Sequence, residues 1–215
     1  MIAAVRVTLG VLGVVCILAG GGFLRLAQYA AHVERAAEDA RQAHDHVERV
    51  RDVGRRLYAA LDEPDGVFRT LATAKVNNVG QQIAVMHDAA EGMAVARRDF
   101  VAAAAAYRDL TRSDLGVDER RVVHADDAFV DAFVETRRMV ERIATHPKDA
   151  GAFRDARNRL QTTLGNAMSE YRSARDAVVA DIRTTLAASR SRAGDADREA
   201  ERQRSRSISE AFRTP

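Results

Sequence analysis

Hydrophobic residues recur every three or four positions along most of the chain. The first such run steps from Leu26 to Leu61 with a period near 3.5 residues, which is typical of coiled coils and long helical bundles. Pro64 and Gly66 follow it in the stretch LDEPDG. Proline lacks a backbone N–H and its ring clashes with the preceding turn, so the pattern predicts that this helix ends here. We therefore expect a first long helix over residues 27–62.

Three further runs have the same helical spacing. They predict helices over residues 67–112, 117–145 and 149–190, separated by TRSDLGVDER and THPKDAG. The fourth run has the most regular heptads, and no stretch alternates as a strand would. Short connections make consecutive helices antiparallel neighbours. The predicted fold is therefore all-α, a long antiparallel four-helix bundle over residues 27–190.

The hydrophobic pattern fades after the fourth run. Residues 191–215 mix arginines with acids and small polar residues. Such a composition predicts a frayed helical extension or a disordered tail. The SRSRS-like tract could contact RNA or anionic lipid, but the interleaved acids favour a solvated tail.

The N-terminal segment is apolar instead of amphipathic. Val7–Leu24 contains 18 residues without a charge. At about 1.5 Å per residue this spans about 27 Å, close to the ~30 Å of a bilayer core. We expect a transmembrane signal-anchor over residues 1–26, continuous with the first bundle helix. A cleaved signal peptide is the alternative, since Arg6 is basic and Ala19 and Gly21 form a small-x-small site.

The orientation of this anchor is weakly encoded. Arg6 lies on one side of the apolar segment, whereas Arg25, Arg35 and Arg41 lie on the other, so the positive-inside count is nearly balanced. Because the segment has the form of a signal-anchor, we expect a single-pass protein of the bacterial inner membrane with a periplasmic bundle. A cytoplasmic-facing bundle and a protein secreted after cleavage are the alternatives.

The amino-acid composition predicts a core made mostly of small side chains. Hydrophobic residues are 47% of the chain, but aromatic residues are only 5%, and alanine supplies much of the remainder. Each buried alanine removes little apolar area, and burial contributes only about 25 cal/mol per Å². We therefore expect a homodimer or a partner membrane protein to supply part of the stability. The net charge of +2, from charges of both signs, argues against nucleic-acid binding.

The sequence contains no signal for enzymatic chemistry. It has no glycine-rich phosphate loop and no Gly-x-Ser-x-Gly motif, and its single Cys16 lies in the apolar segment. Asp126 and Asp127 are adjacent near the start of the third helix, where acids favour the helix dipole. We expect no enzyme and no cofactor.

Histidine spacing also argues against a metal site. None of the six histidines has a glutamate three positions before it, as an inward-facing di-iron bundle would need. His87 and Glu91 share a helix face, but a single such pair is common by chance. We expect no metal.

Polar residues on the hydrophobic seams are the candidate ligand-binding residues. His44, Arg51 and Arg97 occupy a- or d-like positions, and Asn77 and Asn78 fall in the stretch KVNNVGQQ. Polar residues in a bundle core cost stability unless they are paired, and they often set helix register. They therefore indicate either a register-setting or solvated groove, or a polar pocket between helices for a small ligand such as an anion.

This layout resembles the four-helix-bundle sensor domain of bacterial chemoreceptors and sensor kinases. The resemblance covers residues 7–189 and depends on VLGVVCILAGGGFLRLAQYAAHVERA, the heptads, and FRDARNRLQTTLGNAMSEYRSARDAVVADI as the last helix. It implies an extracytoplasmic ligand-binding bundle. The chain departs from the family because Asp181, Arg183 and Arg190 prevent a second span after the fourth helix, and no signalling domain follows.

Two functions are therefore open. The first is a membrane-tethered, extracytoplasmic ligand-binding or sensor-like module, with a polar pocket near His44, Arg51 and Asn78. The alternative is a structural accessory or scaffold subunit of a membrane protein complex, which predicts an exposed apolar or alanine-rich stripe on one helix.

Overall fold

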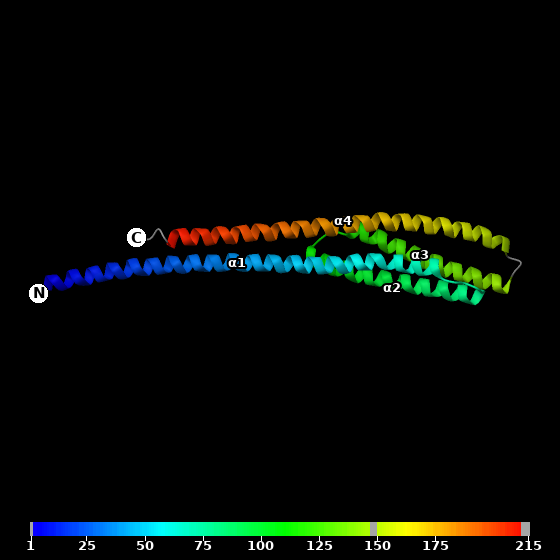
Figure 1. Cartoon of the computed structure of the whole chain (residues 1–215), viewed down its shortest axis with the longest axis horizontal. Coiled ribbons are helices and arrows are strands. Elements are labelled where there is room, and N and C mark those ends of the chain that lie inside the picture. The colour runs from blue at the N-terminus through cyan, green and yellow to red at the C-terminus, as the bar shows by residue number, and fades with distance from the viewer. Residues whose placement is uncertain (1, 147–149, 212–215) are drawn as a thin grey trace. The chain divides into compact units, whose positions relative to one another are not determined.

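The computed structural model describes the backbone of residues 2–146 and 150–211, and the side chains of residues 27–146, 154 and 156–209. The described residues form four helices and no strand, which confirms the all-α, four-helix prediction. Figure 1 labels these helices α1 (Ile2–Thr73), α2 (Val79–Thr111), α3 (Gly116–Thr145) and α4 (Ala150–Ala211).

The chain divides into two compact units, which are described separately. The core unit comprises residues 49–187 and therefore contains α2, α3 and one part each of α1 and α4. The terminal unit comprises the first part of α1, to residue 48, and the last part of α4, from residue 188.

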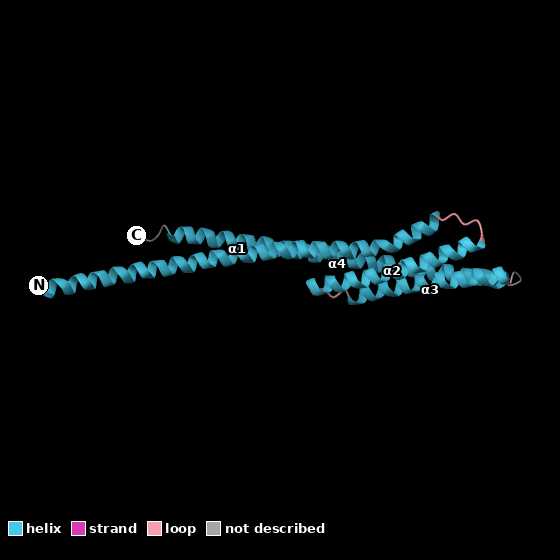
Figure 2. Cartoon of the chain, turned by 90° about the horizontal axis from the view of Figure 1, so that it is seen from below, coloured by secondary structure: helices cyan, strands magenta, loops and turns pink. Residues whose placement is uncertain are grey.

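The core unit contains the large buried side chains. In it, α2 and α3 pack side by side, joined by residues 112–115 (Figures 1 and 2). Phe68 meets the ring of Phe129 edge-on at a centroid distance of 5.0 Å. The side chains with the least exposure in this unit include Leu57, Leu61, Met93, Phe100, Tyr107, Val122, Phe129, Tyr171 and Val178. These residues form one continuous hydrophobic core.

The terminal unit has a much narrower seam. Ala40 and Val47 of α1 are buried, as are Ala193 and Ala200 of α4. Because alanine removes little apolar area from water, this seam contributes less stability per turn than the core unit does.

The predicted helix break at Pro64 is absent, and α1 continues to Thr73 with Pro64 inside it. Proline deprives the carbonyl of Ala60, four residues earlier, of its helical donor. Nearby, the Tyr171 hydroxyl donates to the Leu61 carbonyl at 2.5 Å. Pro64 itself is fully buried. Burial of the proline ring and this hydrogen bond offset part of the local cost of about 3 kcal/mol for proline in a helix.

The chain turns instead at residues 74–78, the longest of the loops drawn in Figure 2. Asn78 caps α2, because its Oδ1 accepts from the Gln81 N–H at 2.8 Å. Gln81 Oε1 in turn accepts from the Asn77 N–H at 2.8 Å. This reciprocal pair resembles a capping box and fixes where α2 begins.

The second helix begins at Val79 instead of residue 67, because residues 67–73 belong to α1, and the remaining boundaries differ mainly at the C-terminus. The third helix lies close to its predicted range of 117–145. The fourth continues to Ala211, so residues 191–211 are helical where the sequence predicts a frayed or disordered tail. Arginine and acid side chains three apart pair along this segment, as in Arg202–Glu199 at 3.6 Å. Such pairs support a helix that the hydrophobic pattern does not reveal.

No helix presents a stretch long and apolar enough to cross a membrane within the part of the chain whose side chains are described. The predicted anchor over residues 1–26 lies outside that part. The backbone of residues 2–26 is helical and belongs to α1 without interruption.

Candidate functional site

An arginine–aspartate pair joins α2 to α3 in the core unit. Arg97 Nε lies 2.7 Å from Asp127 Oδ1, and Arg97 Nη2 donates to Asp127 Oδ2 at 3.3 Å. Only the Nη2 contact is a hydrogen bond, because Arg97 Nε has no hydrogen-bond partner among the described residues and meets Asp127 as an ion pair alone. Both side chains remain partly accessible to solvent, so the pair can exchange partners.

Asp126 precedes Asp127 and points into the bundle core. Successive helical residues are rotated by about 100°, so one of two adjacent acids can face the core while the other faces the groove. Asp126 is only 1% exposed, and its Oδ1 has no hydrogen-bond partner among the residues described. A buried oxygen without a partner keeps its full desolvation cost, which is about 1–3 kcal/mol for a neutral group and more for a charged one.

The surroundings of Asp126 disfavour its ionised form. Burial and the neighbouring Asp127 charge raise the pKa of Asp126 from 3.8 to about 7, while the Arg97 charge acts in the opposite direction. Burial and the charge of Asp126 in turn raise the pKa of Tyr171. The Tyr171 hydroxyl is already donated to the Leu61 carbonyl. Because the charges of Asp127 and Arg97 act in opposite directions on the pKa of Asp126, a change in either charge alters how readily Asp126 ionises.

A groove of about 550 Å³ opens beside this cluster. Its lining comes from α2 and α3 and consists of Glu91, Ala94, Val95, Arg97, Arg98, Asp127 and Val130. Arg98 has no ion-pair partner in the described part of the chain, whereas Glu91 pairs with His87 at 3.3 Å. The groove thus combines two arginines, two acids and a small apolar surface, and Arg98 is the guanidinium in it that no carboxylate of the described residues pairs with. Its chemistry suits an organic anion, since a carboxylate accepts bidentate hydrogen bonds from arginine.

The sequence-predicted binding residues do not gather in this groove. Arg97 lines it, but Asn77 and Asn78 form the cap of α2. Asn78 lies 19 positions before Arg97, which corresponds to about 28 Å along a helix. Arg51 is an exposed residue of α1 and is not among the residues that line the groove. The structure therefore does not bring Arg51 and Asn78 together with Arg97 in this groove.

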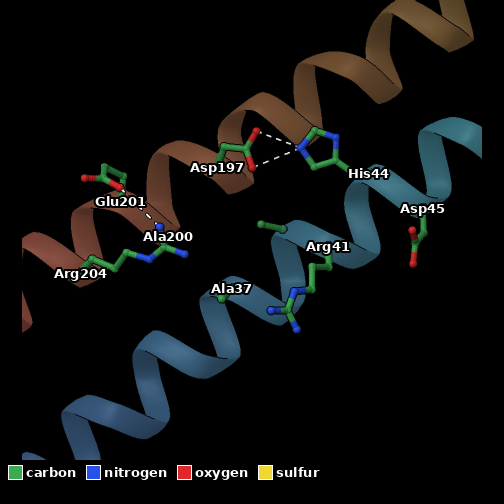
Figure 3. Close-up of a pocket in the computed structure, with 9 residues that line it drawn as sticks. Ala37, Arg41, His44, Asp45, Asp197, Ala200, Glu201 and Arg204 are labelled. Atoms are coloured by element: carbon green, nitrogen blue, oxygen red, sulfur yellow. Dashed lines mark hydrogen bonds and ion pairs between the residues drawn. The ribbon is translucent and has the colours of Figure 1, made fainter.

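His44 lies in the terminal unit, in a pocket of about 440 Å³ (Figure 3). Its Nε2 faces both carboxylate oxygens of Asp197, at 3.0 and 3.2 Å. The other charged residues of this pocket are Arg41, Asp45, Glu201 and Arg204. Charges of both signs are mixed here, and the His44 side chain is 59% exposed. Such exposed pairs stabilise little and select no ligand charge.

Asp126 is the residue that the sequence reading misses. The pair Asp126–Asp127 is interpreted there as a helix N-terminal feature. Yet Val122, Asp126, Phe129 and Phe133 follow one another at spacings of four, three and four. That spacing places Asp126 on the buried face of α3 and could have identified it.

The candidate site is thus the groove at Arg97 and Arg98 together with the buried acid Asp126. The part of the chain with described side chains contains no group of three or more histidine, cysteine or acidic side chains that could hold a metal ion. Comparisons with protein families, with characterised proteins and with solved structures find no match for the chain.

Proposed function

We propose that the chain is a membrane-tethered, sensor-like helical bundle that binds a small organic anion in the groove between α2 and α3. The observation that carries this proposal is Asp126, a carboxylic acid that is 1% exposed and has an oxygen without a partner in the described residues. Buried ionisable groups are costly, and perturbed pKa values cluster at functional sites. The groove next to it supplies the ligand-binding chemistry.

The proposed ligand acts through Arg97. In the free protein, Arg97 pairs with Asp127 and its charge lowers the pKa of Asp126. A carboxylate bound by Arg97 and Arg98 neutralises part of that charge. The pKa of Asp126 then rises further, so ligand binding and protonation favour each other. Because such coupling is reciprocal, the ligand binds more tightly at low pH.

The membrane part of the proposal depends on the apolar N-terminal sequence. Its support is that α1 runs without interruption from Ile2 to Thr73. One helix therefore contains both the apolar segment and the core residues Leu57 and Leu61. We place the bundle in the periplasm of a bacterium, as in the sensor domains that the layout resembles. Alkaline extraction of membranes tests the attachment, and a mature N-terminus at Gly22 or Phe23 would refute an uncleaved anchor.

The ligand proposal is tested on the full chain in lipid nanodiscs. Calorimetric titration with benzoate and succinate, and with the neutral benzamide as an uncharged control, measures the preference for anions. We expect Arg98→Gln and Arg97→Gln each to weaken anion binding at least tenfold. Arg55→Gln is the matched control, since Arg55 is an exposed arginine of α1 outside the groove. Unchanged anion affinity in the Arg97→Gln, Arg98→Gln double variant would refute the site.

The alternative function, a scaffold subunit, predicts an exposed apolar or alanine-rich stripe on one helix. The exposed large hydrophobic side chains of the described residues are Tyr58, Val76, Val79, Val95, Val101, Val117 and Ile208. They are scattered over four helices and a loop, and isolated exposed hydrophobic residues are common on monomers. We therefore place the sensor-like function first. A homodimer or a partner membrane protein is compatible with both functions, and co-purification after mild detergent extraction tests for it.

A further inference from the structure

A second groove lies in the core unit, between the end of α1 and the start of α2. Its volume is about 480 Å³, within the range of about 300–1,000 Å³ that is usual for small-molecule sites. Its lining residues are Glu63, Gly66, Val67, Thr70, Leu71, Ala74, Val85, Asp88 and Ala89. Five of the nine are aliphatic, so the groove is mainly a hydrophobic surface.

The C-terminal part of α1 forms one wall of this groove. Its lining positions follow each other at steps of three and one, which places them on a single helix face. Gly66 leaves a gap in this wall, because a Cβ built there would meet no atom within 4 Å. The Thr70 hydroxyl donates to the Gly66 carbonyl at 3.0 Å and is therefore used by the helix itself. The polar chemistry offered to a ligand thus comes from the two acids.

These acids give the groove a negative charge that nothing in its lining balances. Glu63 and Asp88 have no ion-pair partner among the described residues, and no lysine, arginine or histidine lines the groove. Partial burial, followed by the charge of Asp99 nearby, raises the pKa of Glu63. A positive group placed here would be attracted by the charges of Glu63 and Asp88.

We propose that this groove binds a small hydrophobic organic cation, an amine or a quaternary ammonium ion with an alkyl or aryl body. The cationic head lies against Glu63 and Asp88, and the body covers Val67, Leu71 and Val85. The arginine groove favours the opposite charge, so this second site is independent of the proposed anion site. The two grooves would allow the bundle to respond to two chemically different compounds.

The test compares three probes of one shape on the full chain in zwitterionic nanodiscs, with empty nanodiscs as the blank. The probes are 4-phenylbutyl-trimethylammonium, its neutral tert-butyl isostere and 4-phenylbutane sulfonate. We expect the cation to bind at least tenfold more tightly than the neutral isostere, and the sulfonate not to displace it. Equal affinity of the cation and the neutral isostere, or displacement of the cation by the sulfonate, would overturn the proposal.

Variants locate the site. Glu63→Gln with Asp88→Asn should reduce the affinity for the cation to that of the neutral isostere, whereas Asp109→Asn, at an exposed acid of α2 outside the groove, should not. Gly66→Leu should abolish binding by filling the groove. Gly165→Leu is its control, because a side chain there also meets open space.

Two further measurements distinguish the proposed cation site from the anion site and from a docking site for a partner helix. Arg97→Gln with Arg98→Gln should leave cation binding unchanged, so loss of the anion site and loss of the cation site can be told apart. Displacement of the probe by a lysine-rich amphipathic peptide that binds more than tenfold more tightly would overturn a small-molecule ligand in favour of a partner helix.

Discussion

Replacing Asp126 by asparagine should stabilise the bundle at neutral and alkaline pH. The variant keeps the shape of the side chain but cannot ionise. The pKa of Asp126 is raised from 3.8 to about 7, chiefly by burial. A difference of about three pH units, at about 1.4 kcal/mol per unit, corresponds to about 4 kcal/mol of destabilisation when the acid is ionised in both states.

The direction in which the free energy of unfolding changes with pH follows from how many protons the folded and unfolded chains bind. Between pH 4 and pH 7 the folded chain keeps the proton on Asp126, while the unfolded chain has released it. The free energy of unfolding therefore falls as pH rises through this window and levels off above pH 7. At pH 5 the penalty is about 1.7 kcal/mol, less than half of its full value. The asparagine amide carries one N–H donor more than the protonated carboxyl, and leaving that donor without a partner costs about 1–3 kcal/mol, so the net gain at pH 8 is about 1–3 kcal/mol.

Urea unfolding of the full chain, followed by far-UV circular dichroism at pH 4.5, 6 and 8, measures this effect. Asp131→Asn is the matched control, since Asp131 is an exposed acid on the same helix and has no ion-pair partner in the described residues. If Asp126→Asn and Asp131→Asn have the same stability at all three pH values, the argument from a buried, unpartnered carboxyl is refuted.

Three other substitutions probe the contacts that shape the bundle. Tyr171→Phe removes the donor to the buried Leu61 carbonyl and should cost about 1–3 kcal/mol in urea unfolding; a cost near zero would mean that the carbonyl finds another donor. Asn78→Ala removes the cap of α2 and should cost about 1 kcal/mol, with faster amide exchange in the first turn of α2 as the local readout. Asp197→Asn breaks the exposed pair with His44 and should change the free energy of unfolding by less than about 1 kcal/mol, so a larger loss would show that the pair is more than a surface contact.

Much of the fold follows from spacing alone. The regular three- and four-residue steps predict four helices and their burial, because a helix repeats its buried face at that period. The helix break predicted at Pro64 is wrong because sequence rules for helix ends consider only the backbone hydrogen bond that a proline removes. They contain no information about Tyr171, which lies 107 positions later and reaches the same turn. Tertiary contacts of this kind decide between a helix break and a helix that tolerates proline.

The site is less predictable for a related reason. A heptad position indicates that Arg97 faces a neighbouring helix, and the structure places it in a groove. Periodicity cannot say that its partner is Asp127, nor that Arg98 has none among the described residues. Asn77 and Asn78 form hydrogen bonds that cap the N-terminus of α2, and this role becomes clear only once the start of α2 is known. Pairing across helices is the information that a single sequence lacks.

Pro64 has a mechanical consequence. Removing one rung from the hydrogen-bond ladder lowers the bending stiffness of α1 at that point, since helices kink at proline. Asp62 and Asp65 stand on either side of it, and Arg175 of α4 pairs with both, at 3.9 Å in the case of Asp65. Any change in the curvature of α1 at its most compliant turn therefore alters how one guanidinium is shared between two carboxylates. In this part of the bundle, bending of α1 and the pairing of Arg175 with the two aspartates are therefore coupled.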